Sequence, residues 1–172
     1  MKILVFSDCH GFPKYIRQAL TDHPNADAAV FLGDGAVDAD AVFREFPRVI
    51  PCVLPGNCDS SLSLSAHGLN LPDEAVLDFG GKKFFCLHGH TRGAKSGYGR
   101  MILRASEVQA DVILFGHTHL PICEYAEDPG NLTRRILLFN PGSVGLSYSH
   151  SYGVIYVEKG VISASHGKIT GQ

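Results

Sequence analysis

Three features common in other classes of protein are missing from this chain. It has no run of lysine or arginine and a formal net charge of -2, so no basic surface for nucleic acid is indicated. No apolar stretch approaches the roughly 20 residues needed to cross a bilayer. The five cysteines include no CxxC pair, which argues against a disulfide framework and a thiolate zinc site. We therefore expect a reducing compartment, no membrane partner and no specific nucleic-acid binding.

The beginning of the chain does not extend into a secretory signal. The apolar run 3–6 is broken at once by Ser7 and Asp8, well short of the apolar region of a signal peptide. A cytoplasmic location is therefore expected. The length of 172 residues, with 45% hydrophobic and 19% charged residues, predicts one globular domain over 1–172.

Strands and helices alternate in the first half of the chain. Apolar runs bounded by turn residues predict strands at 3–6, 28–32 and 48–54. A helix is expected after Pro13, with Ile16, Ala19 and Leu20 on one face, and a second after Asp38, which we expect to cap it. Alternation with short connections favours parallel strands.

The second half is richer in strands. Gly80 and Gly81 predict a hairpin between strands 75–79 and 82–87. A helix at 99–109 and strands at 112–115, 122–126, 134–139, 152–158 and 161–166 are also expected. Together the patterns predict an α/β protein in which helices cover two packed sheets of mixed strand direction.

Residue types that bind metals stand directly after five of these strands. They are Asp8 and His10, Asp34, Asn57, His88 and His90, and His117 and His119. In open α/β sheets, ligands bind beyond the carboxyl ends of the strands, so these side chains can converge on one cleft. If the segments are extended, residues i and i+2 point to the same side. Asp8 and His10 can then bind one ion together, and His117 and His119 form a second same-side pair.

Each of these signals is weak alone. A histidine at a strand end is more often a satisfied surface or core residue, and Gly-Asp or Gly-Asn pairs are common in turns. Five such strand ends in one short chain indicate a metal site. Because these candidates outnumber the roughly three protein ligands of one catalytic zinc ion, two ions are the simpler account.

The ordered motifs Asp8-x-His10, Gly33-Asp34, Gly56-Asn57, His88-Gly89-His90 and Gly116-His117-x-His119 resemble those of the calcineurin-like metallophosphoesterases. Within that family the chain is similar to small phosphodiesterases related to vacuolar sorting protein 29. The resemblance runs from Asp8 to about Ser143 and implies an αββα sandwich with a dinuclear site.

The resemblance also implies a division of the ligands. Asp8, His10 and His119 would hold one ion, Asn57, His88 and His117 the other, and Asp34 would bridge them. We expect two divalent ions, with manganese placed before iron(II), zinc or nickel, since nitrogen and hard oxygen ligands suit them all.

The chain departs from the wider family at Cys58, where many members have a histidine that protonates the leaving group. His90 and a metal-bound water are alternative proton donors. Cys58 is either a small packed residue or, less simply, a nucleophile. Asp59 either orients a ligand or is a solvated turn residue, and Arg92 and Lys95 either contact a substrate phosphate or lie on a solvated loop.

We expect Asp34, Asn57, His90 and Asp59 to serve hydrolysis of a phosphodiester, or also a monoester, by a hydroxide that the two metals activate. With that hydroxide and both aspartates, two divalent ions leave about one positive charge, which matches a monoanionic phosphodiester. The partner is then a small phosphate ester. The alternative is a non-catalytic metal-binding scaffold for protein interactions. A homo-oligomer is compatible with the sequence, but no feature demands one.

Overall fold

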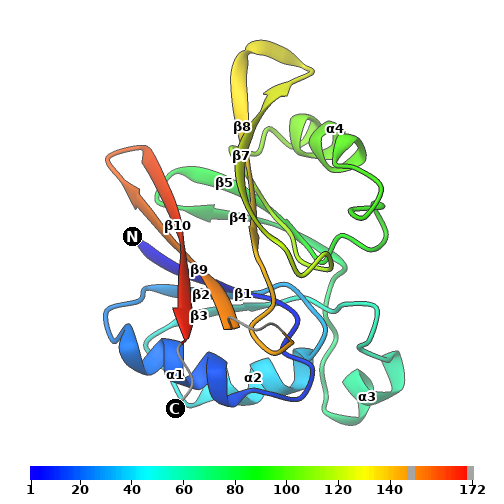
Figure 1. Ribbon diagram of the computed structural model, residues 1–172, viewed down its shortest axis with the longest axis vertical. Helices are drawn as coiled ribbons and strands as arrows, with labels where there is room; N and C mark the ends of the chain where they lie inside the picture. The colour runs from blue at the N-terminus through cyan, green and yellow to red at the C-terminus, as the bar shows by residue number, and fades with distance from the viewer. Residues whose placement is uncertain (147–149, 170–172) are drawn as a thin grey trace.

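The computed structural model describes residues 1–146 and 150–169, in which two five-stranded sheets pack against each other (Figure 1). The first sheet has the order β10-β9-β1-β2-β3. Its strands are β1 (Lys2–Phe6), β2 (Ala28–Phe31), β3 (Ile50–Val53), β9 (His150–Glu158) and β10 (Val161–Ile169). Strands β1, β2 and β3 are parallel, whereas β9 and β10 form an antiparallel hairpin added at β1.

The second sheet has the order β4-β5-β6-β8-β7. Its strands are β4 (Glu74–Phe79), β5 (Lys82–Leu87), β6 (Val112–Leu114), β7 (Pro121–Asp128) and β8 (Asn131–Pro141). Strands β5, β6 and β8 are parallel, and each edge strand is antiparallel to its neighbour. Gly80 and Gly81 both have positive φ, as the two-residue turn between β4 and β5 requires.

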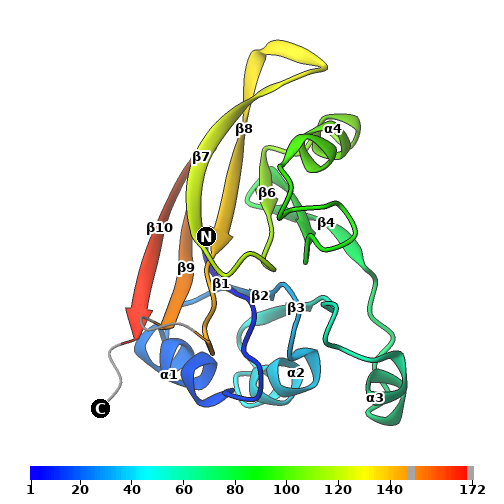
Figure 2. The ribbon, with the colours of Figure 1, turned by 45° about the vertical axis from the view of Figure 1, so that its right-hand side comes forward.

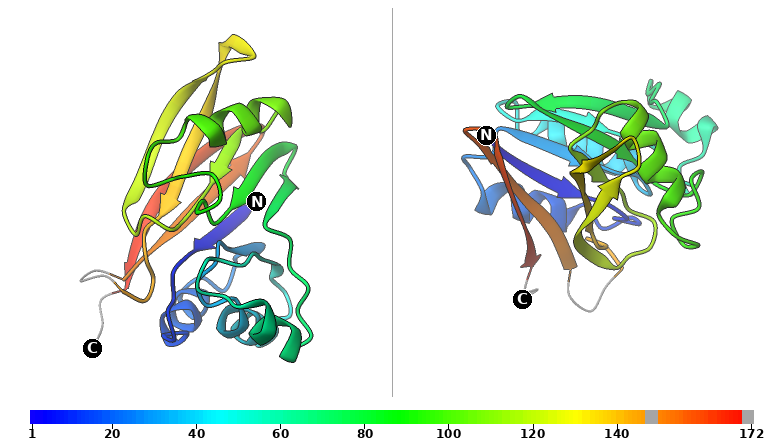
Figure 3. Two further views of the ribbon diagram at one scale, coloured as in Figure 1. Left: turned by 90° about the vertical axis from the view of Figure 1, so that its right-hand side faces the viewer. Right: turned by 90° about the horizontal axis from the view of Figure 1, so that it is seen from above.

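Helices cover both outer faces of the two sheets (Figure 3). Helices α1 (Lys14–Asp22) and α2 (Ala36–Arg44) pack on the first sheet, and α4 (Gly99–Glu107) packs on the second. Strand β1 shows why two layers form: Ile3 and Val5 face the core between the sheets, while Leu4 and Phe6 face the helices. The αββα sandwich expected from the sequence is confirmed.

The core between the sheets is filled by large side chains from both layers. Phe84 of β5 and Phe139 of β8 are fully buried there with Leu32 and Leu114. Each such side chain stabilises the fold by about 1.5–3 kcal/mol through burial of apolar surface. The strand ends that carry the candidate ligands therefore project from a well-packed base.

Three local expectations need correction. Asp38 lies in the first turn of α2, and Gly35, not Asp38, is the residue that precedes the helix. The third strand is shorter than 48–54, because only Ile50–Val53 pairs with β2. Helix α3 (Ser61–Ala66) was not expected; the hydroxyl of Ser60 accepts a hydrogen bond from Ser63 N and caps it. No helix in the described part of the chain is long and apolar enough to cross a membrane.

Candidate metal centre

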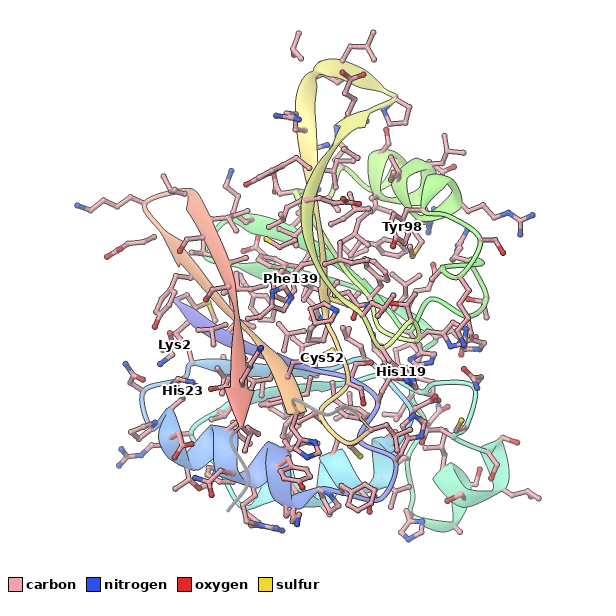
Figure 4. All side chains as sticks on the ribbon, in the orientation of Figure 1. Lys2, His23, Cys52, Tyr98, His119 and Phe139 are labelled. Atoms are coloured by element: carbon pink, nitrogen blue, oxygen red, sulfur yellow. The ribbon has the colours of Figure 1, made fainter. Side chains whose placement is uncertain are left out.

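Loops from both sheets meet beyond the carboxyl ends of β1, β2, β5 and β6. The first sheet contributes Asp8 and His10 after β1 and Asp34 after β2, and Asn57 follows β3. The loops of the second sheet contribute a further set of imidazoles, His88, His90, His117 and His119. Figure 4 shows His119 where the loops of the second sheet approach the first layer.

One group of ligand atoms gathers around Asp8. The Nε2 atoms of His119 and His10 lie 3.2 and 3.9 Å from Asp8 Oδ1. Both Asp8 Oδ1 and His10 Nε2 are buried and have no hydrogen-bond partner among the described residues. Buried polar atoms in folded proteins are normally paired, so these two point to a missing partner. A cation that accepts both an oxygen and a nitrogen ligand fits this position.

A second group gathers around His88. Its Nδ1 lies 2.7 Å from Leu32 O, and since a carbonyl oxygen only accepts, Nδ1 is the donor. Nε2 of His88 then faces two oxygen atoms, Asn57 Oδ1 at 3.2 Å and Asp34 Oδ2 at 3.5 Å. A lone pair on Nε2 would repel both oxygens unless a proton or a metal cation lay between them. Although burial lowers it, the hydrogen bond to Asp34 and the charges of Asp8 and Asp34 raise the pKa of His88 above its ordinary value.

Asp34 lies between the two groups. Its Oδ2 is 3.8 Å from His10 Nε2 and 3.5 Å from His88 Nε2, and its Oδ1 accepts a hydrogen bond from Cys58 N at 2.8 Å. Burial opposes ionisation, but the hydrogen bonds from His88 and Cys58 hold the pKa of Asp34 well below its usual range. An ionised carboxylate facing both groups can bind two cations at once.

The remaining imidazoles complete the second group. The ring centroid of His117 lies 5.1 Å from that of His88 and 6.1 Å from that of His90, which itself lies 5.3 Å from His88. Burial, with the nearby charges of His88 and Lys95, lowers the pKa of His117 to about 4, and burial with His88 lowers that of His90. Both rings are thus neutral at pH 7 and keep a lone pair for a metal or a hydrogen bond.

The backbone at the ligands is not extended, and this corrects the i, i+2 argument. Among the described residues, seven other than glycine have positive φ, and five of them are candidate ligands: Asp8, His10, Asp34, His117 and His119. Such backbone is uncommon and gathers at functional sites. Asp8 and His10 still converge, but His119 lies beside Asp8 while His117 lies beside His88. The histidine pair therefore serves both groups rather than one.

Asp59 holds the loop that carries Asp34. Its two carboxylate oxygens accept hydrogen bonds of 2.8–2.9 Å from the backbone N–H groups of Asp34, Gly35, Ala36 and Gly56. Of the two alternatives for Asp59, these contacts favour the residue that orients a candidate ligand, and it does so through the backbone of Asp34 rather than through its side chain. A Cβ atom on Gly56 would overlap Asp34 Oδ1, which explains why glycine stands there.

Two residues of the turn 140–143 fix the other ligand loops. The Asn140 side-chain amide donates to Gly116 O at 2.9 Å and to Thr118 Oγ1 at 3.1 Å. Ser143 Oγ donates to Asp8 O at 2.8 Å. Both belong to the Asn140-Pro141-Gly142-Ser143 turn, whose composition alone indicates a turn and not these contacts.

The basic residues after His90 differ in their surroundings. Arg92 forms hydrogen bonds of 2.6 and 3.0 Å with the carboxylate of Glu74, so its charge is already compensated. Lys95 is close enough to His117 for its charge to lower the pKa of that imidazole.

Cys58 is exposed at the edge of the centre. Its Sγ lies within 4.8 Å of ligand atoms of His10 and Asp34. Burial and the charges of Asp34, Asp59 and Asp8 raise the pKa of the thiol, so the reactive thiolate is disfavoured at neutral pH. This argues against a nucleophilic role.

Comparison with known proteins identifies the family. Residues 1–160 match the model of the calcineurin-like phosphoesterase superfamily domain. The chain is 30% identical over 163 residues to the probable metallophosphoesterase YsnB of Bacillus subtilis, covering 92% of this chain and 85% of YsnB. It is 34% identical over 105 residues to the phosphodiesterase YfcE of Escherichia coli K12, covering 58% and 49% of the two chains.

Solved structures share the fold. A predicted phosphoesterase from Streptococcus pneumoniae aligns with a TM-score of 0.75 at 22% identity, covering 97% of this chain and 88% of its own. Vps29 from Entamoeba histolytica, solved with Zn²⁺, aligns with a TM-score of 0.69 at 19% identity and covers 98% and 99% of the two chains. With a matching family model over most of its length and a relative at 30% identity, the chain belongs to the calcineurin-like phosphoesterase superfamily.

Proposed function

We propose that the chain hydrolyses a phosphodiester, and more slowly a monoester, at two divalent cations. One observation carries the proposal: the ionised Asp34 carboxylate faces both groups of ligand atoms, while Asp8 Oδ1 and His10 Nε2 stay buried without a hydrogen-bond partner in the described structure. Unpaired buried atoms of this kind are costly unless a ligand satisfies them.

Seven residues would hold the ions. Asp8, His10 and His119 would bind one cation, Asn57, His88 and His117 the other, and Asp34 would bridge them. When bound, two cations would polarise the phosphoryl group as Lewis acids and would lower the pKa of a water bound to them to about 7. Manganese is the first candidate, with iron(II), zinc and nickel as alternatives, because histidine and carboxylate ligands accept each of them.

Three further residues would position a metal ligand or the substrate. Asp59 keeps Asp34 in its backbone conformation through four N–H groups. His90 stands next to His88 with no side-chain hydrogen bond among the described residues. Because its Nδ1 is buried, Nε2 is the ring atom that would contact an ester oxygen. Lys95 would add a positive charge near His117, where phosphoryl oxygens need compensation.

A phosphodiester is preferred on grounds of charge and relationship. Two divalent cations together with Asp8, Asp34 and one hydroxide would leave about one positive charge, which suits a monoanion. The relative YfcE is named a phosphodiesterase, which supports the same substrate class. The similarity to Vps29 is one of fold, so the interaction scaffold remains the alternative that the experiment must exclude.

The test is hydrolysis of bis-p-nitrophenyl phosphate by chelator-stripped protein, with manganese, zinc, iron(II), nickel or buffer added back. The monoester p-nitrophenyl phosphate runs alongside. Release of nitrophenolate that a metal restores, faster from the diester, is the expected result. If no metal restores activity on either ester, the proposal fails and the scaffold reading replaces it.

A further inference from the structure

A pocket of about 460 Å³ adjoins the candidate metal centre. Asn57 and His90 line it, so it opens directly beside the second group of ligands. Its opposite wall comes from α3 and from the segment that leads to β4, both at the edge of the first layer (Figure 2). The volume falls within the roughly 300–1,000 Å³ typical of small-molecule sites.

The wall away from the metals offers uncharged polar groups. Ser61, Ser65 and Asn70 line the pocket, and none of their side chains forms a hydrogen bond within the described residues. Hydroxyl and amide groups both donate and accept, so they match the hydroxyls of an alcohol. Leu64 and Leu71 supply apolar surface between them, suited to the carbon skeleton of the same ligand.

The charge of the pocket is negative. Asp73 and Asp59 line it, and no lysine or arginine does. Arg92 and Arg100 line a separate hollow that shares Asp73 with this pocket, and Arg92 is already bound to Glu74. A second phosphate entering this pocket would meet a carboxylate and no cation, which is unfavourable.

We propose that this pocket binds one alcohol arm of the phosphodiester, and that the arm is neutral and hydroxyl-bearing, of the chemistry of a nucleoside, a sugar or glycerol. The proposal rests on the diesterase function above. It adds specificity: the pocket rejects an arm that carries a further phosphate and gains little from a purely aromatic arm. Substrate choice then depends on α3 and the 69–73 segment rather than on the metals.

Three esters with one leaving group test this. They are thymidine 5′-(p-nitrophenyl phosphate), the same ester with a 3′-phosphate, and p-nitrophenyl phenyl phosphate. In the manganese-loaded enzyme we expect the highest kcat/KM for the neutral nucleoside ester. The 3′-phosphorylated ester should be slower by about fivefold or more, the effect of one unscreened like charge near the surface.

Two lysine variants locate the effect. Ser65→Lys places a cation in the pocket and should reduce the penalty for the 3′-phosphate by about fivefold. Ser63→Lys is the matched control, because Ser63 lies on the same helix, is exposed and does not line the pocket. It should leave the ratio of the two nucleoside esters unchanged.

The outcomes separate the two proposals. Equal kcat/KM for the two nucleoside esters, or an equal response to both lysine variants, overturns the pocket assignment while hydrolysis of bis-p-nitrophenyl phosphate upholds the diesterase. A phenyl ester as good as the nucleoside ester overturns the hydroxyl-bearing arm. Loss of all metal-restored hydrolysis instead removes the diesterase function, and the pocket proposal falls with it.

Discussion

Two buried aspartates of this protein, Asp128 and Asp8, differ in how many hydrogen bonds their carboxylates accept. Asp128, at the end of β7, accepts hydrogen bonds from Ser106 Oγ at 2.5 Å, Gly130 N at 2.9 Å and Arg134 Nη1 at 2.8 Å. Asp8, after β1, accepts one from His117 N at 3.1 Å, and its Oδ1 has no hydrogen-bond partner among the described residues. The first carboxylate holds a corner of the fold together, and under the proposed function the second would bind a cation.

The pKa values follow the same division. Hydrogen bonds from Ser106 and Gly130 and the charge of Arg134 lower the pKa of Asp128, whereas burial raises the pKa of Asp8. Ionisation of Asp8 therefore costs stability, and in the proposed centre a bound cation would return it.

The largest expected effect is a loss of activity, which should follow from a change in the candidate metal centre and not from a change at Asp128. Asp34→Ala removes the carboxylate that faces both ligand groups, and we expect loss of metal-dependent hydrolysis of bis-p-nitrophenyl phosphate by on the order of 10³-fold. Asp128→Asn is the matched control and should keep the wild-type rate at temperatures where it is folded. Full activity in Asp34→Ala would contradict the proposed centre.

Asp59 tests whether the loop geometry matters as much as the ligands. Asp59→Ala leaves four backbone N–H groups without their acceptor, so we expect metal affinity to fall by about 10–100-fold, measured by competition with a chelating indicator. Asp59→Asn keeps one acceptor oxygen and should fall between. Asp38→Ala, in the first turn of α2, is the control. An unchanged affinity in Asp59→Ala would show that the hydrogen bonds accepted by Asp59 do not affect metal binding.

Thermal unfolding should separate Asp8 from Asp128 directly. Metal at about 100 times its Kd stabilises the wild type by about 2.7 kcal/mol, which raises Tm by roughly 5–10 °C. In Asp8→Asn the metal-free Tm should rise, because the buried charge is gone. The metal-induced rise should shrink, because the first group of ligands has lost its carboxylate while the second group keeps its ligands. In Asp128→Asn the metal-free Tm should fall and the full metal-induced rise should persist. A metal-induced rise of wild-type size in Asp8→Asn would remove Asp8 from the centre.

The pH dependence of metal-free stability should have opposite signs at the two sites. Asp128 has a lowered pKa, so its contribution is complete above the unfolded value of 3.8 and is lost as the pH falls through the folded pKa. Asp8 has a raised pKa, so its penalty is absent below 3.8 and complete once the pH exceeds the folded pKa. Tm curves in chelator for the two Asn variants should therefore approach the wild type from opposite sides as the pH falls. Approach from the same side would contradict the assignment.

Most candidate ligands of the metal centre could be predicted from sequence, because their positions depend on residue type at strand ends. Apolar runs located the strands that carry Asp8, Asp34, His88 and His117, and the chemistry of those side chains indicated a metal site. Local patterns carry such information since strands and their ends are set by neighbouring residues.

Features that depend on contacts distant in sequence could not be predicted. Asp59 meets Asp34 across 25 residues, and Ser143 meets Asp8 across 135, so neither role has a local signal. The positive φ of His10 and His119 contradicted the extended backbone assumed for them, because long-range packing imposes that conformation. The start of α3 is different, because a serine that caps a helix, here Ser60, is a local signal that the sequence contains.

The smallest expected effect is at Cys58, which lies beside Asp34 without sharing its role. The raised pKa keeps its thiol protonated at neutral pH, and the proposed centre needs no thiolate nucleophile. Cys58→Ala should therefore lose less than about tenfold in kcat on bis-p-nitrophenyl phosphate and keep its metal affinity. Removing a proton donor or a nucleophile typically costs 10²–10⁴-fold, so a loss of that size would place Cys58 in the chemistry. A wild-type pH profile in Cys58→Ala would show that Cys58, the residue that departs from the family pattern, is dispensable. The chemistry would then depend on the proposed metals and their seven ligands.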